Sequence, residues 1–116
     1  MTRVDTLGAA RSALAENPVT LLYFSGNDCG VCDAIRPKIE ELLAARPRIA
    51  SFEINIEASP EAAAQFDIFT IPGILLFVHG KETIREARYL SLDALRERID
   101  RYLSLLPEKE PTRLEA

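Results

Sequence analysis

The sequence predicts an α/β domain with a mixed β-sheet and helices on both of its faces. Val19–Phe24 and Gly73–Val78 are continuous apolar runs of strand length, as expected for strands that are buried on both faces. Helical patterns alternate with strand patterns along most of the chain, and the last two strands are joined by the turn His79-Gly80-Lys81. Two parallel crossovers followed by a hairpin give a mixed sheet.

The first half of the chain predicts helix, strand, helix and strand. Thr6–Glu16 places apolar residues on one helical face, and Asn17-Pro18 ends that helix. The apolar run Val19–Phe24 follows, and a loop leads from it into a helical pattern over Ala34–Ala45. Ile49–Ile56 alternates apolar and polar side chains, which predicts a strand with one polar face.

The second half predicts a short helix, two strands and a final helix. Ser59-Pro60 has the residue types of an N-cap and a first helical position. Gly73–Val78 is the next strand, and Glu82–Arg88 is a more polar strand near a sheet edge. Ser91 opens the last helix, which has an apolar stripe. The expected element order is αβαβαββα.

The 116 residues suit one domain, which we place at residues 1–106, followed by a flexible tail at residues 107–116 rich in proline and charge. Lys and Arg number 14 against 18 Asp and Glu, a net charge of −4 that argues against a nucleic-acid partner. No apolar run approaches the roughly 20 residues that span a bilayer. An acidic residue follows soon after Met1 in place of an apolar leader, so we expect a cytoplasmic protein. We also expect a monomer that binds no membrane.

The loop over Ser25–Cys32 carries both cysteines of the chain, Cys29 and Cys32, three positions apart. A strand that delivers a cysteine to the first turn of a helix places its sulfur near unpaired N–H groups and the positive end of the helix dipole. That setting favours the reactive thiolate and predicts reversible dithiol–disulfide exchange. The alternative is a pair of buried or metal-binding thiols. Structural zinc needs four ligands, and His79 is the one histidine, so we expect no metal or cofactor.

Four features, in the right order, resemble the thioredoxin family over about Thr6–Leu106. They are Cys29-Gly30-Val31-Cys32, similar to the family's Cys-Gly-Pro-Cys; Pro37, five positions after the second cysteine; Glu53-Ile54-Asn55-Ile56-Glu57 followed by Pro60; and Thr70-Ile71-Pro72 before an apolar strand, which resembles the family's cis-proline loop. The resemblance implies the thioredoxin fold.

The resemblance also implies roles. Cys29 would be the exposed nucleophile and Cys32 the buried resolving thiol. Pro72 would follow a cis peptide bond, and Ile71 would offer its backbone to an extended substrate. The remaining positions implied to contact substrate are Gly30, Val31 and Arg88. The expected partners are proteins with disulfide bonds and a recycling enzyme that resembles thioredoxin reductase.

Other positions depart from the family pattern. Asp28 and Ser25 replace two tryptophans, Tyr23 replaces a buried aspartate implicated in proton transfer, and Glu53 replaces the lysine that faces it. We hypothesise that Glu53 supplies the proton acceptor, with a pKa raised by burial. The alternative is an exposed acid at the edge of a strand. Asp28 is either a solvated loop acid or N-cap, or a charge that raises the pKa of Cys29.

Arg88 stands where a glycine flanks the family's substrate groove, so a large cation there would narrow the groove or select acidic partners, unless it is simply solvated. Two functions remain open. The first is a thiol–disulfide oxidoreductase that reduces protein disulfides. The second is a binding module or chaperone-like adaptor on the same fold, with little redox turnover.

Overall fold

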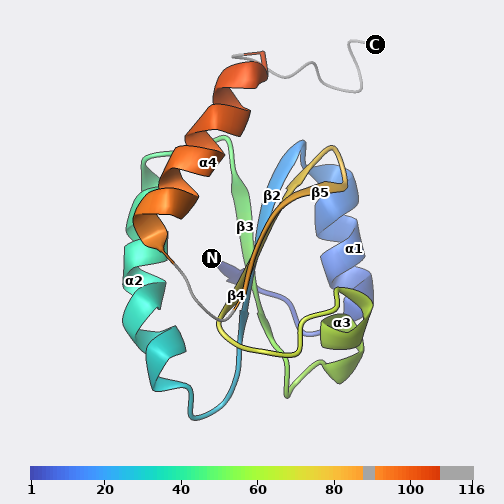
Figure 1. Cartoon of the computed structure of the whole chain (residues 1–116). Helices are drawn as coiled ribbons and strands as arrows, with labels where there is room; N and C mark the ends of the chain where they lie inside the picture. Colours follow the sequence, from blue (N-terminus) through green and yellow to red (C-terminus); the bar gives the residue numbers. More distant parts are fainter. Residues whose placement is uncertain (88–90, 108–116) are drawn as a thin grey trace.

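A computed structural model describes residues 1–87 and 91–107 of the chain (Figure 1). Nine elements are present in this part: β1 (Thr2–Arg3), α1 (Leu7–Glu16), β2 (Val19–Ser25), α2 (Gly30–Ala44), β3 (Ala50–Asn55), α3 (Pro60–Gln65), β4 (Gly73–Val78), β5 (Lys81–Ala87) and α4 (Leu92–Leu105). The eight elements that the sequence predicts are all confirmed, with boundaries shifted by a few residues. The largest shift is at the start of α2, which begins four residues before the expected Ala34 and therefore includes Cys32.

The five strands form one mixed sheet in the order β1-β3-β2-β4-β5. Strands β1 and β2 run parallel to β3, whereas β4 is antiparallel to both β2 and β5. The strand β1, at the start of the chain, was not predicted from the sequence. β1 has two residues, which pair with Phe52 and Glu53, and a segment of that length has no periodicity by which the sequence could reveal it.

Helices cover both faces of the sheet, with α2 and α4 on one side and α1 and α3 on the other (Figure 1). Side chains of β2 alternate between the two apolar cores: Leu21 and Tyr23 belong to the core under α2 and α4, whereas Leu22 and Phe24 belong to the core under α1 and α3. All seven residues of β2 are buried. This explains the unbroken apolar run in the sequence, because neither face of β2 meets water.

Local caps explain where the helices begin. The hydroxyls of Thr6 and Ser91 accept hydrogen bonds from the backbone N–H groups of Ala9 and Ala94, as N-caps do. Pro60 occupies the first turn of α3, where its missing N–H costs nothing. The turn between β4 and β5 places His79 and Gly80 at φ 50° and 79°, the left-handed conformation of a tight hairpin.

This arrangement brings the carboxyl ends of the parallel strands β2 and β3 to one edge of the sheet, where α2 begins. Arg88 and the expected tail beyond Pro107 lie outside the described residues, so the domain boundary at residue 106 stays a prediction. Within the described ranges, the helices are all too short or too polar to cross a bilayer.

Candidate active site

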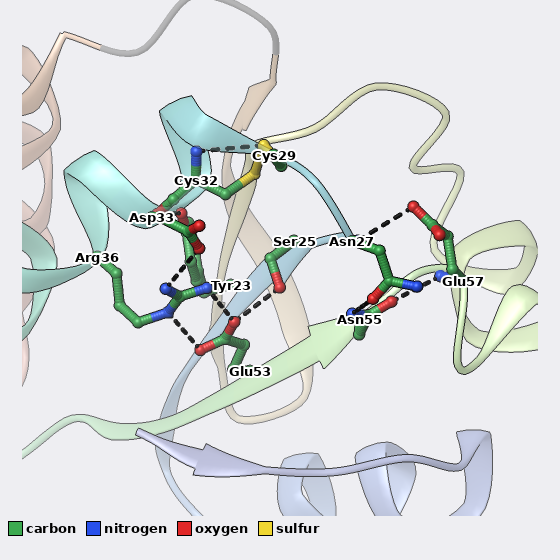
Figure 2. The surroundings of a disulfide bond; sticks show 10 residues. All are labelled: Tyr23, Ser25, Asn27, Cys29, Cys32, Asp33, Arg36, Glu53, Asn55 and Glu57. Carbon is green, nitrogen blue, oxygen red and sulfur yellow. Dashed lines mark hydrogen bonds and ion pairs between the residues drawn. A yellow bond between two sulfur atoms is a disulfide. The ribbon is translucent and has the colours of Figure 1, made fainter.

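Cys29 occupies the N-cap of α2, at the end of the short loop that follows β2. Its Sγ is bonded to Sγ of Cys32 in a disulfide and accepts a hydrogen bond of 3.1 Å from the backbone N–H of Cys32 (Figure 2). The same N–H and the positive end of the 15-residue helix face the sulfur of Cys29. These groups stabilise a thiolate at Cys29.

The two sulfurs differ in access to solvent. Cys32 is fully buried in the core under α2 and α4, whereas Cys29 is partly exposed. Gly30 is exposed as well, and Val31 exposes 61% of its surface between the cysteines. The sulfur of Cys29 is therefore accessible from solvent beside the apolar side chain of Val31, whereas Cys32 is enclosed by the protein.

The loop before β4 lies against the cysteine loop. The Ile71–Pro72 peptide bond is cis, as the family resemblance implies. Ile71 and Cys29 pack on the same core, and a Cβ built on Gly26 would lie 2.6 Å from Cδ1 of Ile71 and 3.1 Å from Oε1 of Glu57. Glycine at position 26 thus permits the close approach of these segments.

Tyr23 links the sheet to the first turn of α2. Its ring is fully buried and its hydroxyl donates a hydrogen bond of 2.7 Å to the carbonyl oxygen of Cys32. Burial raises the pKa of Tyr23 to about 12, so the hydroxyl remains a donor at neutral pH. Tyr23 is therefore more than a core residue, since it fixes the backbone of the second cysteine.

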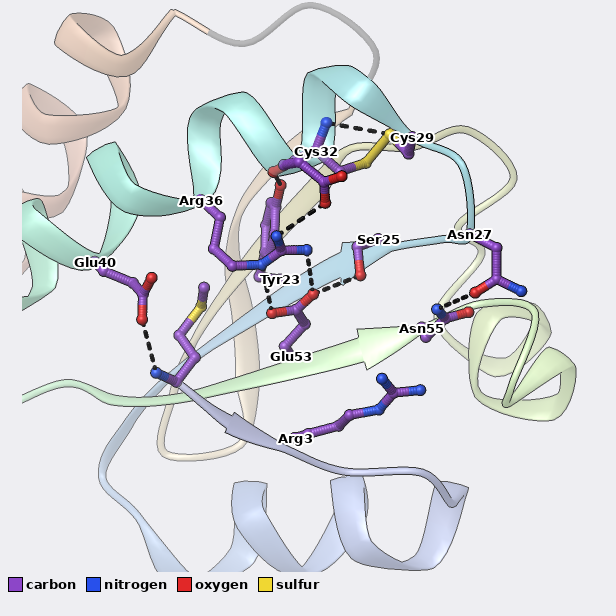
Figure 3. A network of polar contacts seen from close by, with 12 residues as sticks. Arg3, Tyr23, Ser25, Asn27, Cys29, Cys32, Arg36, Glu40, Glu53 and Asn55 are labelled. Atoms are coloured by element: carbon purple, nitrogen blue, oxygen red, sulfur yellow. Dashed lines mark hydrogen bonds and ion pairs between the residues drawn. A yellow bond between two sulfur atoms is a disulfide. The ribbon is translucent and has the colours of Figure 1, made fainter.

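Glu53 lies beside Tyr23 on the neighbouring strand, as expected. Both of its carboxylate oxygens have donors (Figure 3). Arg36 donates Nε to Oε1 at 2.9 Å and Nη2 to Oε2 at 2.7 Å, and the hydroxyl of Ser25 donates to Oε2 at 2.7 Å.

The expectation that burial raises the pKa of Glu53 is wrong. Burial alone would raise it, but the hydrogen bonds from Arg36 and Ser25 and the charges of Arg36 and Arg3 outweigh burial and lower the pKa of this carboxyl. The alternative prediction, that Glu53 is an exposed acid at the edge of a strand, is also wrong, because its side chain is only 18% exposed and β3 is an inner strand of the sheet.

A second polar cluster braces the cysteine loop (Figure 2). Asn55 donates Nδ2 to Oδ1 of Asn27 at 3.0 Å, and its Oδ1 accepts from the backbone N–H groups of Glu57 and Ala58. Glu57 in turn accepts a bond from the backbone N–H of Asn27 at 3.1 Å. The end of β3 thereby holds the loop two residues before Cys29.

Comparison with known proteins agrees with this geometry. The sequence model of the family described as Thioredoxin matches residues 6–101. The chain belongs to the thioredoxin family. A thioredoxin-like protein, YdfQ, of Bacillus subtilis is 31% identical over 105 residues, which are 90% of this chain and 94% of that protein. A thioredoxin of Chlamydia muridarum is 33% identical over 84 residues, 72% of this chain and 82% of that protein.

Solved thioredoxins share the fold. A thioredoxin variant from Halobacterium salinarum superposes with a TM-score of 0.81 at 24% identity, covering 91% of this chain and 93% of that one. Thioredoxin from Plasmodium falciparum gives 0.81 at 19% identity, covering 88% and 99%. With its Cys29–Cys32 pair at the start of α2, the chain is a thiol–disulfide oxidoreductase of the thioredoxin family.

Three residues of this thioredoxin-family site were not anticipated from the sequence: Arg36, Asn27 and Asn55. The signal for Arg36 is its position, one helical turn after Cys32 and three residues after Asp33. Asp28 also differs from one of its expected roles, because Cys29 and not Asp28 is the N-cap. Asp28 has φ 52°, a conformation in which aspartate is among the favoured residues.

Proposed function

We propose that this protein is a cytoplasmic protein-disulfide reductase. The observation that carries the proposal is the unequal placement of the two sulfurs: Cys29 is partly exposed at the N-cap of α2, and Cys32 is fully buried behind it. An accessible thiolate at Cys29 suits attack on the disulfide of a substrate protein. The buried Cys32 can then attack Cys29 and release the substrate.

In the proposed reaction the Cys29 thiolate attacks one sulfur of the substrate disulfide. A mixed disulfide forms, and the other substrate sulfur leaves as a thiolate that takes a proton from solvent. Cys32, once deprotonated, attacks Sγ of Cys29, so the Cys29–Cys32 disulfide forms and the second substrate thiolate leaves. Two electrons pass from the dithiol to the substrate. A reductase resembling thioredoxin reductase then restores the dithiol.

The proposed substrate surface surrounds Cys29. Gly30 and Val31 lie exposed at the start of α2, and Ile71 and Pro72 form the neighbouring loop. We propose that an extended substrate segment lies along the backbone of Ile71, with Val31 providing apolar contact. The selection of acidic partners by Arg88, outside the described residues, and the monomeric state stay predictions.

Trapping by single-cysteine variants tests the proposal. Cys32→Ser cannot resolve the mixed disulfide, so it should accumulate covalent complexes with reducible proteins that disappear on addition of dithiothreitol. Cys29→Ser lacks the nucleophile and should capture none, which makes it the matched control. An adaptor with little redox turnover would instead bind its partners equally well, without covalent bonds, in both variants.

A further inference from the structure

A charged cluster lies under the first turns of α2. The guanidinium of Arg36 donates two parallel hydrogen bonds to the carboxylate of Glu53 on β3. It donates a third, from Nη1, to Oδ1 of Asp33 at 3.0 Å. Its Cζ lies 5.9 Å from the centroid of the Tyr23 ring, within the range of a cation–π contact. Figure 2 shows these side chains converging between the helix and the sheet.

The cluster is connected to the redox pair through one cation–π contact and two hydrogen bonds. Arg36 lies against Tyr23, the hydroxyl of Tyr23 binds the carbonyl oxygen of Cys32, and the N–H of Cys32 binds Sγ of Cys29. Arg36 also follows Cys32 by one helical turn, which places both residues on the same side of α2. A charge at this position acts on the cysteines through a partly buried region, because the Arg36 side chain is 29% exposed.

Glu53 is held as an anion in this cluster. A bidentate guanidinium and the hydroxyl of Ser25 occupy both of its oxygens, and the side chains of Arg36 and Glu53 are 29% and 18% exposed. The other charged groups that face Glu53 and Arg36 are Arg3 from β1 and Asp33 from α2. The pKa of Glu53 is lowered and that of Arg36 is raised, so neither group changes charge near neutral pH.

We infer that Arg36 is a positioning residue of the redox site: it holds Glu53 as a fixed anion and supplies the positive charge that stabilises the thiolate formed at Cys29 when the disulfide is reduced. In this site a permanent ion pair takes the place of a titrating buried carboxylate. The role competes with the proton-acceptor role expected for Glu53, which requires a carboxylate that changes its protonation during turnover.

The inference rests on the proposed disulfide exchange, but its test can fail separately. We would reduce the full chain and measure the rate at which iodoacetamide alkylates Cys29 between pH 4 and 9, by mass spectrometry. The variants are Arg36→Met, Arg36→Lys, Glu53→Gln and the double variant Arg36→Met/Glu53→Gln. Arg46→Met is the matched control, because Arg46 makes an equally bidentate pair with Asp100 at the other end of α2.

We expect the wild type to show the ionisation of Cys29 alone. Arg36→Met should slow alkylation at pH 7 by about three- to tenfold, the effect of removing a unit charge at several ångströms in a partly polar interior. It should also add a second ionisation, that of the released Glu53, which the double variant loses. Arg36→Lys should stay within about twofold of the wild type, since it keeps the charge.

The dithiol–glutathione equilibrium gives a second readout. At pH values above the ionisation of Cys29, Arg36→Met should shift this equilibrium toward the disulfide, because the reduced form loses stabilisation of its thiolate; a tenfold change corresponds to about 30 mV. Arg46→Met should leave both the pH profile and the equilibrium unchanged.

An Arg36→Met profile that matches that of Arg46→Met overturns the inference, as does a wild-type ionisation between pH 6 and 8 that Glu53→Gln removes. If Arg36→Met does not fold, Glu53→Gln provides the same test with the opposite sign. It should speed alkylation at pH 7 by about three- to tenfold, and an unchanged or slower rate contradicts the role. A wild type that alkylates normally but never exchanges with glutathione or insulin refutes the proposed function instead.

Discussion

Asp28 shows how one residue can meet a backbone demand and a chemical one. It has φ 52°, which disfavours most residues with a side chain, and it directly precedes Cys29, the proposed nucleophile. Asparagine tolerates the same conformation without a charge. We therefore expect Asp28→Asn to raise the rate at which Cys29 is alkylated at pH 7 by about two- to fivefold, because it removes a negative charge beside the thiolate.

Asp67→Asn is the control for this measurement, since Asp67 has a similar φ of 54° and its backbone carbonyl accepts a hydrogen bond from Arg85 of β5. It should leave the rate unchanged. Equal rates for the wild type and Asp28→Asn would mean that only the backbone conformation accounts for aspartate at this position.

Tyr23 offers a second test at the scale of a single residue. Tyr23→Phe keeps the buried ring but removes the hydrogen bond to the carbonyl of Cys32, and we expect it to lower the free energy of unfolding by about 1–2 kcal/mol. Urea denaturation measures the change. Tyr102→Phe removes a bond of 3.1 Å to the carbonyl of Thr83 at a half-buried site and should cost less. Equal costs would argue against a special role for Tyr23.

At the scale of elements, the site depends on how the ends of β2 and β3 are joined. Asn55 is buried and makes three hydrogen bonds here, one to Asn27 in the loop after β2 and two to backbone N–H groups in the loop after β3. We expect Asn55→Ala to lower the free energy of unfolding by about 1–2 kcal/mol, because it removes three hydrogen bonds made by a buried side chain. Residues 26–29 should also exchange their amide hydrogens faster.

Asn17→Ala is the matched control, since Asn17 makes one such bond, to the carbonyl of Ala13 at the end of α1. It should cost less than about 1 kcal/mol and leave exchange at residues 26–29 unchanged. A loop that stays protected in Asn55→Ala would show that the junction does not hold the cysteines in place.

The elements differ in how well the sequence predicts them, for physical reasons. The strand at Val19–Ser25 is predictable because both of its faces are apolar, and Thr6 and Ser91 mark helix starts through side chains that act locally. The strand at Thr2–Arg3 carries no such local signal, since it exists only through pairing with β3.

The same distinction separates the parts of the site. The cysteines, Pro72 and the register of Tyr23 with Glu53 follow from motif and order. The protonation of Glu53 depends on Arg36, which lies 17 positions away in the chain and reaches the carboxylate only because α2 packs over β3. The sequence indicates that Glu53 is buried, but it does not show the arginine that reaches the carboxylate and outweighs the effect of burial on its pKa.

For the whole molecule, the partly buried ion pair between Arg36 and Glu53 predicts a pH dependence of stability. The pKa of Glu53 in the folded chain lies below its usual value of 4.5, and those of Asp100 and Glu82 are also lowered by their arginine partners. The unfolded chain therefore binds protons first as the pH falls. The stabilisation is complete above about pH 4.5 and is lost as the pH falls through the folded pKa values.

We expect the urea midpoint to be nearly constant between pH 6 and 8 and to fall steadily below pH 4.5. Glu53→Gln should lower stability at pH 7 and flatten part of the acid limb. Glu41→Gln, which changes an exposed carboxylate of α2, serves as the control and should leave the slope unchanged. An acid limb that is equally steep in Glu53→Gln would contradict the assignment of Glu53 as an anion in the folded chain.

Redox titration of the Cys29–Cys32 pair against glutathione buffers, read by thiol alkylation and paired with insulin reduction, tests the central claim most directly. We expect a reversible two-electron couple within a few tens of millivolts of the thioredoxin value of about −270 mV, with turnover of insulin. A pair that never equilibrates with glutathione, or that forms its disulfide without transferring electrons to insulin, would contradict the reductase and favour a binding module.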